Sequence, residues 1–199
     1  KISIYNGVNW DAERVAVTPP EYEQVAESQN PVVAAIGRLV PAKGFDLLIA
    51  AWESKFGYLF VVGDGPERGS LEALVAARGL AENVFFLGHK DSALDYIGAA
   101  DLVVIPSRNE GFSYVFAEAL LEKTPVISTD VPIPNEVLPK QYICAIENVE
   151  AIHLLLTTAL SNVNRLEQSF APLFDYAEKN LTLARSRDQT LAAYEALIE

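Results

Sequence analysis

The sequence is poor in positive charge, cysteine and histidine, and each shortage excludes a class of protein. Its 15 lysine and arginine residues stand against 27 aspartate and glutamate residues, for a net charge of −12 at pH 7. Because nucleic acid and anionic membrane surfaces are bound through basic faces, we expect neither as a partner of this chain. No apolar run approaches the roughly 20 residues that span a membrane. Two histidines and one cysteine also leave no metal-ligand set of the zinc type.

The one cysteine, Cys144, cannot form an internal disulfide, which favours a reducing compartment. We therefore expect the protein in the cytoplasm. Cys144 lies in the apolar run "QYICAI", where a small core residue is a better interpretation than a nucleophile. The chain starts at Lys1 without a signal-peptide pattern, and we interpret it as a piece of a longer protein.

What the sequence does contain is a regular alternation of apolar runs and amphipathic stretches. Half of the 199 residues are hydrophobic, which is enough for one large domain with a real core. Runs rich in valine and isoleucine predict six strands, at 31–39, 58–65, 83–89, 101–107, 125–130 and 142–146. Their consecutive apolar residues suit a sheet that is covered on both faces.

The stretches between these strands predict helices. Residues 44–55 and 112–123 place apolar side chains at the helical spacing i, i+3, i+4, i+7, and the pattern is helical from about residue 148 to the end. Strands and helices that alternate with short links imply parallel strands and right-handed crossovers. We therefore predict an α/β fold over residues 1–199: a doubly wound, parallel, Rossmann-like sheet of about six strands, followed by C-terminal helices.

In such a sheet, ligands bind beyond the carboxyl ends of the strands, so the loops there are the candidate site. The first loop, "GRLVPAKG", carries Arg38 and Lys43 just before a helix. A helix N-terminus is itself positive, so cations beside it are unfavourable unless an anion such as phosphate lies between them. The two residues could equally be solvated surface cations. The next loop, "VVGDGPERG", lacks the spacing of a dinucleotide motif, and we interpret it as a tight strand-to-helix turn.

A third loop opens the segment "RNEGFSYVFAEAL", residues 108–120. Gly111 permits a close approach of the backbone, and the amides from Gly111 to Ser113 are free donors if a helix starts there. Glu110 lies at the mouth of this loop and Glu118 lies within the helix. Carboxylates accept hydrogen bonds, so the pair suits a ligand rich in hydroxyl groups. Alternatively, Glu110 only favours the helix dipole and Glu118 is a solvated helix residue.

The order of these motifs resembles the C-terminal, donor-binding domain of the retaining family-4 (group 1) glycosyltransferases, which have the two-domain GT-B fold. The segment "YNGVN" resembles the family's "NGVD", "GRLVPAKGFDLLIAA" its "GR…KG…LL.A", and "VVGDGPER" its "GDGP" turn. The series continues with "NVFFLG", "AADLVVIPS" and "EGFSYVFAEAL". The last is similar to the family's E-x7-E motif and matches it with Glu110 and Glu118. Each motif is weak alone, but the ordered set is specific.

The resemblance implies a role for each matched position. Arg38 and Lys43 would neutralise the diphosphate of the donor. Glu118 would accept hydrogen bonds from the ribose, and Glu110 would be the catalytic residue facing the donor sugar. The base would lie against the backbone after the third strand. The other donor contacts that the resemblance implies are Gly88, His89, Lys90, Gly111, Phe112 and Ser113.

The reaction that the resemblance implies is transfer of a hexose from a UDP-sugar or GDP-sugar, with retention at the anomeric carbon. The acceptor would be a glycan or a lipid-linked glycan held by an N-terminal domain that these residues lack, at the inner face of the membrane or in the cytoplasm. We expect the 199 residues alone to bind the nucleotide without transferring sugar. No metal or other cofactor is expected, because the strand-end loops hold no Asp-x-Asp pair.

Two departures from the family pattern affect the side of the site that would hold the sugar. "LLEKTPV" follows the second glutamate where the family has small residues and glycine. "VPIPNEV" replaces the glycine-rich "GG.PE" loop, keeping Glu136 but adding Pro132 and Pro134, which stiffen the loop. Two alternatives stay open: an epimerase of GT-B shape that acts on a nucleotide-sugar, and a module that binds a nucleotide without chemistry.

Overall fold

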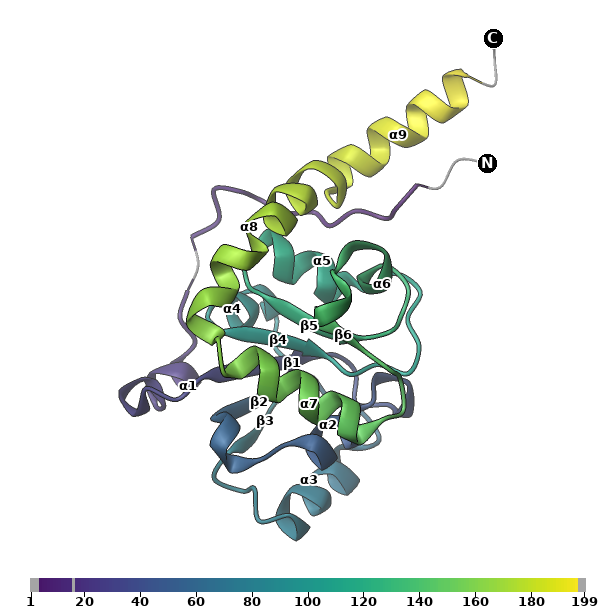
Figure 1. Cartoon of the computed structure of the whole chain (residues 1–199). Coiled ribbons are helices and arrows are strands. Elements are labelled where there is room, and N and C mark those ends of the chain that lie inside the picture. Colours follow the sequence, from purple (N-terminus) through teal and green to yellow (C-terminus); the bar gives the residue numbers. More distant parts are fainter. Residues whose placement is uncertain (1–3, 16, 197–199) are drawn as a thin grey trace.

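Six parallel strands form one sheet in the order β3-β2-β1-β4-β5-β6 (Figure 1). The computed structural model describes residues 4–15 and 17–196. The strands are β1 (Val32–Ile36), β2 (Tyr58–Val62), β3 (Val84–Gly88), β4 (Leu102–Ile105), β5 (Val126–Thr129) and β6 (Ile143–Cys144). Every neighbouring pair is parallel, so the predicted doubly wound sheet of about six strands is confirmed.

Each strand is shorter than the apolar run that predicted it. β1 and β2 both end directly before a glycine whose φ is positive, 154° at Gly37 and 137° at Gly63. The chain turns out of the sheet at these glycines, so the apolar residues after them belong to loops. β3 lies at one edge of the sheet, and four of its five residues are only half-buried.

Nine helices lie among the described residues. They are α1 (Pro20–Glu23), α2 (Phe45–Ala51), α3 (Arg68–Ala77), α4 (Ala93–Gly98), α5 (Tyr114–Leu121), α6 (Pro134–Val137), α7 (Val149–Leu160), α8 (Val163–Asn180) and α9 (Leu183–Glu195). Short 3-10 turns occur at Ala26–Ser28, Pro41–Lys43, Ser54–Phe56 and Lys140–Tyr142. Helix α2 packs on α3 and α7, helix α4 packs on α5, and helix α8 packs on both α5 and α7 (Figure 1). The sheet is therefore covered on both faces, as its apolar strands predict.

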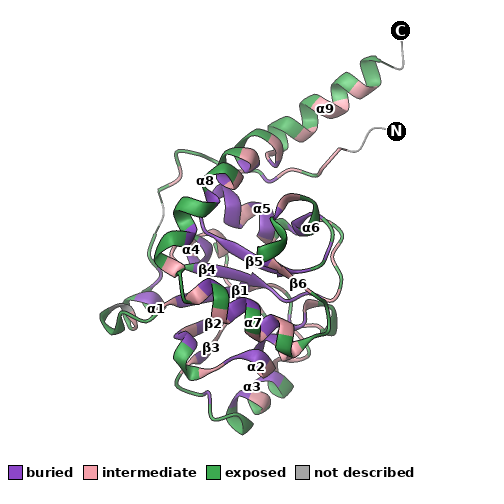
Figure 2. Cartoon of the chain, viewed as in Figure 1, coloured by how far each residue is buried: buried purple, intermediate pink, exposed green. Residues whose placement is uncertain are grey.

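The C-terminal region is helical from Val149 to Glu195, apart from short breaks between its three helices, as predicted. Its longest helix, α8, packs through Leu166, Phe170, Phe174 and Ala177, which follow helical spacing and are all buried. In contrast, α9 has no buried residue among those described and extends away from the sheet (Figure 2). A helical pattern predicts the helix but not the surface that covers it.

The N-terminal segment is attached to the junction between α8 and α9. The backbone amide of Val8 donates to Leu181 at 2.9 Å, and the amide of Leu183 donates to Val8 at 2.8 Å. A Cβ on Gly7 would lie 2.3 Å from the carbonyl oxygen of Thr182, so glycine is needed for this close contact. The two ends of the described chain therefore lie on the same side of the molecule (Figure 1).

Among the described residues, no helix has both the length and the apolar character needed to cross a membrane.

Candidate nucleotide-sugar site

The strand order reverses between β1 and β4, and the loops after these two strands meet there. From β1 the chain continues to β2 and β3 toward one edge, and from β4 it continues to β5 and β6 toward the other. Ligands of open parallel sheets bind at the carboxyl end of such a reversal. The amide of Arg108 donates to the carbonyl of Ala42 at 2.8 Å, which joins the two loops directly. The candidate residues Lys43 and Glu110 therefore come together at this point.

The loop between β1 and α2 places its two cations differently. Arg38 is exposed, whereas Lys43 ends the 3-10 turn and its side chain is 29% exposed. Gly44 follows with a φ of 66°, and a Cβ there would lie 2.1 Å from the carbonyl oxygen of Pro106. Only glycine lets the loop approach the end of β4 so closely.

Glu110 pairs with Lys43 across the two loops. Its Oε1 accepts hydrogen bonds from Lys43 Nζ and from Ser107 Oγ, each at 2.7 Å, and its side chain is only 8% exposed. Ser107 is itself fixed, because Thr129 Oγ1 donates to its carbonyl at 2.6 Å. The charge of Lys43 is thus balanced within the chain by Glu110, which neither the phosphate interpretation nor the surface interpretation of this loop predicts.

The start of α5 offers free hydrogen-bond donors. Within the described residues, the backbone amides of Gly111, Phe112 and Ser113 donate to no backbone or side-chain acceptor. Gly111 has no positive φ, and a Cβ there would meet nothing within 4 Å, so the chain alone does not require glycine at this position. The open space in front of Gly111 and the free amides together can receive an anion or a hydroxyl oxygen.

Glu118 lies in the second turn of α5 and is half-buried. Burial, with a smaller effect from the neighbouring Glu122 carboxylate, raises the pKa of Glu118 above its usual value. No hydrogen bond to its carboxylate occurs among the described residues, whereas Glu122 pairs with Arg14. A half-buried carboxylate that has no donor among the described residues can accept hydrogen bonds from a ligand.

A hollow of about 430 Å³ lies at the carboxyl ends of β1, β2 and β3, beside the side chain of Lys43. It is lined by Ile36, Gly37, Arg38, Val62, Gly63, Asp64, His89, Lys90 and Ala93. A Cβ on Gly63 would lie 1.9 Å from the carbonyl oxygen of Gly37, so the "GDGP" turn is a tight turn, as predicted. Arg38 shares this hollow with His89 and Lys90, whereas Lys43 lies with Glu110 at the neighbouring loop.

Lys90 is not a free cation in this arrangement. Its Nζ donates to Glu21 of α1 at 2.7 Å and lies 5.3 Å above the ring centre of Tyr96, whose hydroxyl also donates to Glu21 at 3.0 Å. The Glu21 carboxylate raises the pKa of Lys90. Gly88 has a φ of 72° and pairs with Gly63 through its carbonyl, at 2.8 Å. The turn 88–90 therefore presents backbone and His89 to the hollow, with Lys90 bound to α1.

Sequence reasoning missed Arg108 and Asp46. Both guanidinium Nη atoms of Arg108 donate to the Asp46 carboxylate at 2.7 Å, which lowers the pKa of Asp46 and raises that of Arg108. The signal was present in the sequence. Arg108 directly precedes "NEG", and Asp46 lies in the first turn of α2. They follow β4 and β1, which are neighbouring strands of the sheet. Ser107 was missed in the same way.

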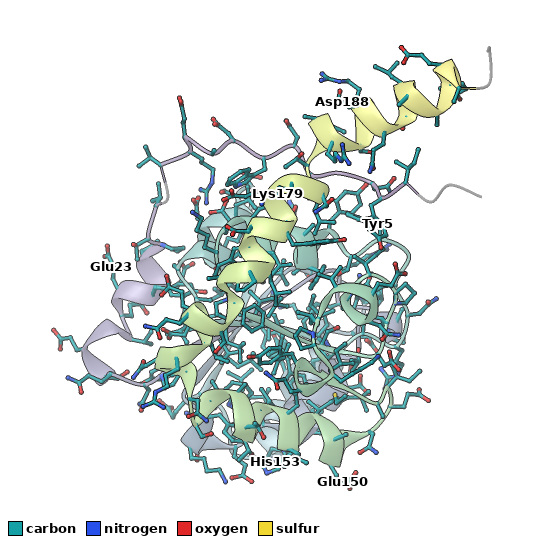
Figure 3. The ribbon with its side chains drawn as sticks, turned by 45° about the horizontal axis from the view of Figure 1, so that its top comes forward. Tyr5, Glu23, Glu150, His153, Lys179 and Asp188 are labelled. Atoms are coloured by element: carbon teal, nitrogen blue, oxygen red, sulfur yellow. The ribbon has the colours of Figure 1, made fainter. Side chains whose placement is uncertain are left out.

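The loop that departs from the family pattern, residues 131–136, is strained. Ile133 has φ 72° and ψ −64°, values that a β-branched residue rarely adopts, and Pro134 begins α6 immediately after it. Glu136 accepts a hydrogen bond from Tyr5, which raises the pKa of Tyr5 to about 12. Figure 3 shows Tyr5 on the N-terminal segment. This loop is thus bonded to the N-terminal segment, which is itself attached to the junction between α8 and α9.

In the part of the chain that the structure describes, no group of three or more histidine, cysteine, aspartate or glutamate side chains could hold a metal ion. What the site combines is a lysine paired with a buried carboxylate, free amides at a helix start, an unpartnered carboxylate and an adjoining hollow. These groups can bind a phosphate and several hydroxyl groups at one edge of the sheet.

Comparison with known proteins assigns the chain to a family. The family model of the group 1 glycosyl transferases matches residues 21–171. The O-antigen biosynthesis glycosyltransferase WclY from Escherichia coli is 31% identical over 145 residues, which are 72% of this chain and 41% of WclY. The chain therefore spans less than half of that relative.

Solved structures show the same fold. HepE from Anabaena, crystallised with UDP, matches with a TM-score of 0.84 at 22% identity, covering 97% of this chain and 57% of HepE. Other crystals of HepE hold UDP with glucose, or UDP-glucose. The C-terminal domain of LpcC, a group 1 family protein from Francisella tularensis, matches over its whole length and 89% of this chain, with a TM-score of 0.72 at 20% identity. The chain belongs to the group 1 glycosyltransferases and has the fold of their C-terminal GT-B domain.

Proposed function

We propose that this chain is the donor-binding domain of a retaining hexosyltransferase that uses a nucleoside-diphosphate sugar. The observation that carries the proposal is the meeting of Lys43, Glu110 and the free amides 111–113 where the strand order reverses. HepE, which has the same fold, binds UDP and UDP-glucose, which supports UDP as the nucleotide. GDP is the alternative that the screen below tests.

The proposed donor lies across the two loops. Its diphosphate contacts Lys43, Arg38 and the amides at the start of α5, where positive charge is available. Its ribose hydroxyls donate to Glu118. Its base enters the hollow beside residues 88–90, and its hexose lies against Glu110 as the catalytic residue. The chain's task in the reaction is electrostatic: it stabilises the leaving diphosphate and the positive charge that develops on the sugar.

The acceptor in this proposal is a glycan or lipid-linked glycan, in the synthesis of a surface polysaccharide. The similarity to WclY, an O-antigen biosynthesis enzyme, supports that class. In this proposal a second domain holds the acceptor. We therefore still predict that these 199 residues alone transfer no sugar. The same holds for retention at the anomeric carbon and for the cytoplasmic location.

The direct test is a calorimetric screen of UDP and GDP with the chain and its Lys43→Ala variant. Binding of one diphosphate is expected, and Lys43→Ala should weaken it at least about tenfold, because a charge-assisted hydrogen bond contributes about 1.5–3 kcal/mol. Lys55→Ala is the matched control, since Lys55 is exposed in the turn before β2 and pairs with its near neighbour Glu53. Binding by neither nucleotide, or equal binding by both lysine variants, would contradict the proposal.

A second expectation is that donor binding needs no metal ion. Lys43, Arg38 and the amides of α5 already offset the diphosphate charge, and Glu110 and Glu118 are assigned to hydroxyl groups. UDP affinity measured with excess chelator should therefore agree within about twofold with affinity in added magnesium or manganese. An affinity that collapses in chelator and returns with the ion would show that these cations are insufficient.

A further inference from the structure

Arg108 connects three segments at the edge of the proposed site. Its Nη1 and Nη2 donate to the two oxygens of Asp46, each at 2.7 Å, and Nη1 also donates to the carbonyl of Pro41 at 2.7 Å. Its Nε donates to Glu147 at 3.1 Å, and its backbone amide donates to Ala42 at 2.8 Å. Arg108, in the loop after β4, thus holds the turn after β1, the first turn of α2 and the loop before α7.

This arrangement leaves Arg108 little capacity to bind a phosphate itself. A guanidinium presents its five N–H donors in a fixed fork. All three nitrogens of Arg108 already donate to acceptors of the chain. Exposed ion pairs usually contribute little to stability, but a bidentate pair with additional backbone bonds is the exception. The side chain is 24% exposed, so this network is also partly shielded from solvent.

The turn that Arg108 holds is the one that ends in Lys43. Pro41 and Ala42, whose carbonyls accept from Arg108, precede Lys43 in the 3-10 turn. Glu110, two residues after Arg108, pairs with Lys43 itself. The two loops are therefore joined at two points. A diphosphate that binds Lys43 competes with Glu110 at one of them and leaves the other intact.

We propose that Arg108 is a positioning residue of the diphosphate site. Through Asp46 and the carbonyls of Pro41 and Ala42, it keeps the turn 41–43 in place, so that Lys43 stays oriented when phosphate oxygens replace Glu110. The inference rests on the proposed function, because it assigns to Lys43 the role of phosphate ligand. Arg108 acts on the donor through Lys43 and not by direct contact.

The decisive variant is Asp46→Asn, because positioning and simple charge predict opposite results. Removing a negative charge next to a diphosphate site should tighten or preserve UDP binding if only the electrostatic field matters. It should also free Arg108 to reach a phosphate. If Arg108 must be anchored by Asp46 to hold the turn, UDP binding instead weakens by about three- to tenfold. Calorimetry with UDP, well below the melting temperature, measures this change, and unchanged or tighter binding overturns the inference.

A double-mutant cycle tests whether Arg108 acts through Lys43. Arg108→Ala should weaken UDP binding by about three- to tenfold in the wild-type background and by less than about twofold in the Lys43→Ala background. An equal loss in both backgrounds means that Arg108 contacts the nucleotide directly, which overturns the positioning role. If the chain without substitutions binds neither UDP nor GDP, the proposed function fails first and the inference fails with it.

Arg14→Ala is the matched control for the loss of an arginine network. Arg14 also pairs with two carboxylates, Asp95 and Glu122, and its side chain is 21% exposed. It lies at the carboxyl end of α5, away from the loops that meet at β1 and β4. This variant should lower the melting temperature and weaken UDP binding less than Arg108→Ala does, because its partner Glu122 acts on Glu118 only as a neighbouring charge. An equal loss of affinity in Arg14→Ala and Arg108→Ala would show a general effect of stability and would overturn the inference.

Discussion

Glu118→Ala is expected to weaken UDP binding at least about tenfold. A hydrogen bond to a charged group contributes about 1.5–3 kcal/mol, and 1.4 kcal/mol corresponds to a factor of ten. Glu118 is half-buried and has no donor among the described residues, so ribose hydroxyls would supply the hydrogen bonds that it lacks. Glu82→Ala is the control, because Glu82 is exposed at the opposite end of β3. Unchanged affinity in Glu118→Ala would remove Glu118 from the ribose role.

In the wild-type chain without nucleotide, Glu118 is expected to lower the stability of the fold. Burial raises the pKa of Glu118 in the folded state, so the folded chain binds this proton more tightly than the unfolded chain does. The contribution of Glu118 to the free energy of unfolding therefore falls as pH rises from the unfolded pKa through the higher folded pKa, and at pH 7 it is unfavourable.

Glu118→Gln removes this cost while keeping the shape of the side chain. It should melt at a higher temperature than wild type at pH 7, and the difference should shrink as pH falls toward 4. Its UDP affinity should nevertheless be lower, since the amide has lost the carboxylate charge. A variant that gains stability and loses affinity would separate a ligand-binding role from a structural one. Lower stability at pH 7 would show that Glu118 has a partner within the chain.

The local patterns predicted the sheet, the loops and the residues at their ends, because β-strand and helix periodicity depend on near neighbours in sequence. They did not predict which charged groups pair. Glu110 lies 67 residues from Lys43, and Arg108 lies 62 residues from Asp46. The electrostatic argument left a bound anion and solvated surface cations open at Lys43, and it had no means of identifying Glu110 as the partner.

Lys90 shows the same limit. Its partner Glu21 lies 69 residues away, in a helix of four residues that no pattern predicted. The opposite case is α9, whose sequence pattern predicts a helix but whose described residues bury no side chain. Pairing and burial depend on where distant elements meet, and this follows from the strand order, which the apolar runs alone do not give.

The second large effect is expected for Gly44→Ala, at the contact between the β1 and β4 loops. Gly44 has a φ of 66°, and a Cβ would lie 2.1 Å from the carbonyl oxygen of Pro106. The left-handed conformation alone costs a residue with a side chain about 1–2 kcal/mol, and a clash with backbone adds to it because no side chain can move away. We expect a loss of at least about 3 kcal/mol, or about 6–12 °C in melting temperature for a chain of this size.

Two other glycines separate the causes of this loss. Gly79 also has a φ of 66°, but a Cβ there would meet nothing within 4 Å, so Gly79→Ala measures the cost of the conformation alone. Gly69 lies in α3 without a positive φ and without a near neighbour, so Gly69→Ala should stabilise the chain by about 0.5–1 kcal/mol. The expected order of melting temperatures is Gly69→Ala, wild type, Gly79→Ala and then Gly44→Ala.

The difference between Gly44→Ala and Gly79→Ala measures how closely the two loops must approach. Lys43 precedes Gly44, and Pro106 precedes Ser107, which donates to Glu110. A displacement at Gly44 therefore also separates Lys43 from Glu110, and UDP affinity should fall in Gly44→Ala but not in Gly79→Ala. If Gly44→Ala melts no lower than Gly79→Ala, the loops are not in contact at Pro106. The geometry that brings Lys43 to Glu110 would then be wrong.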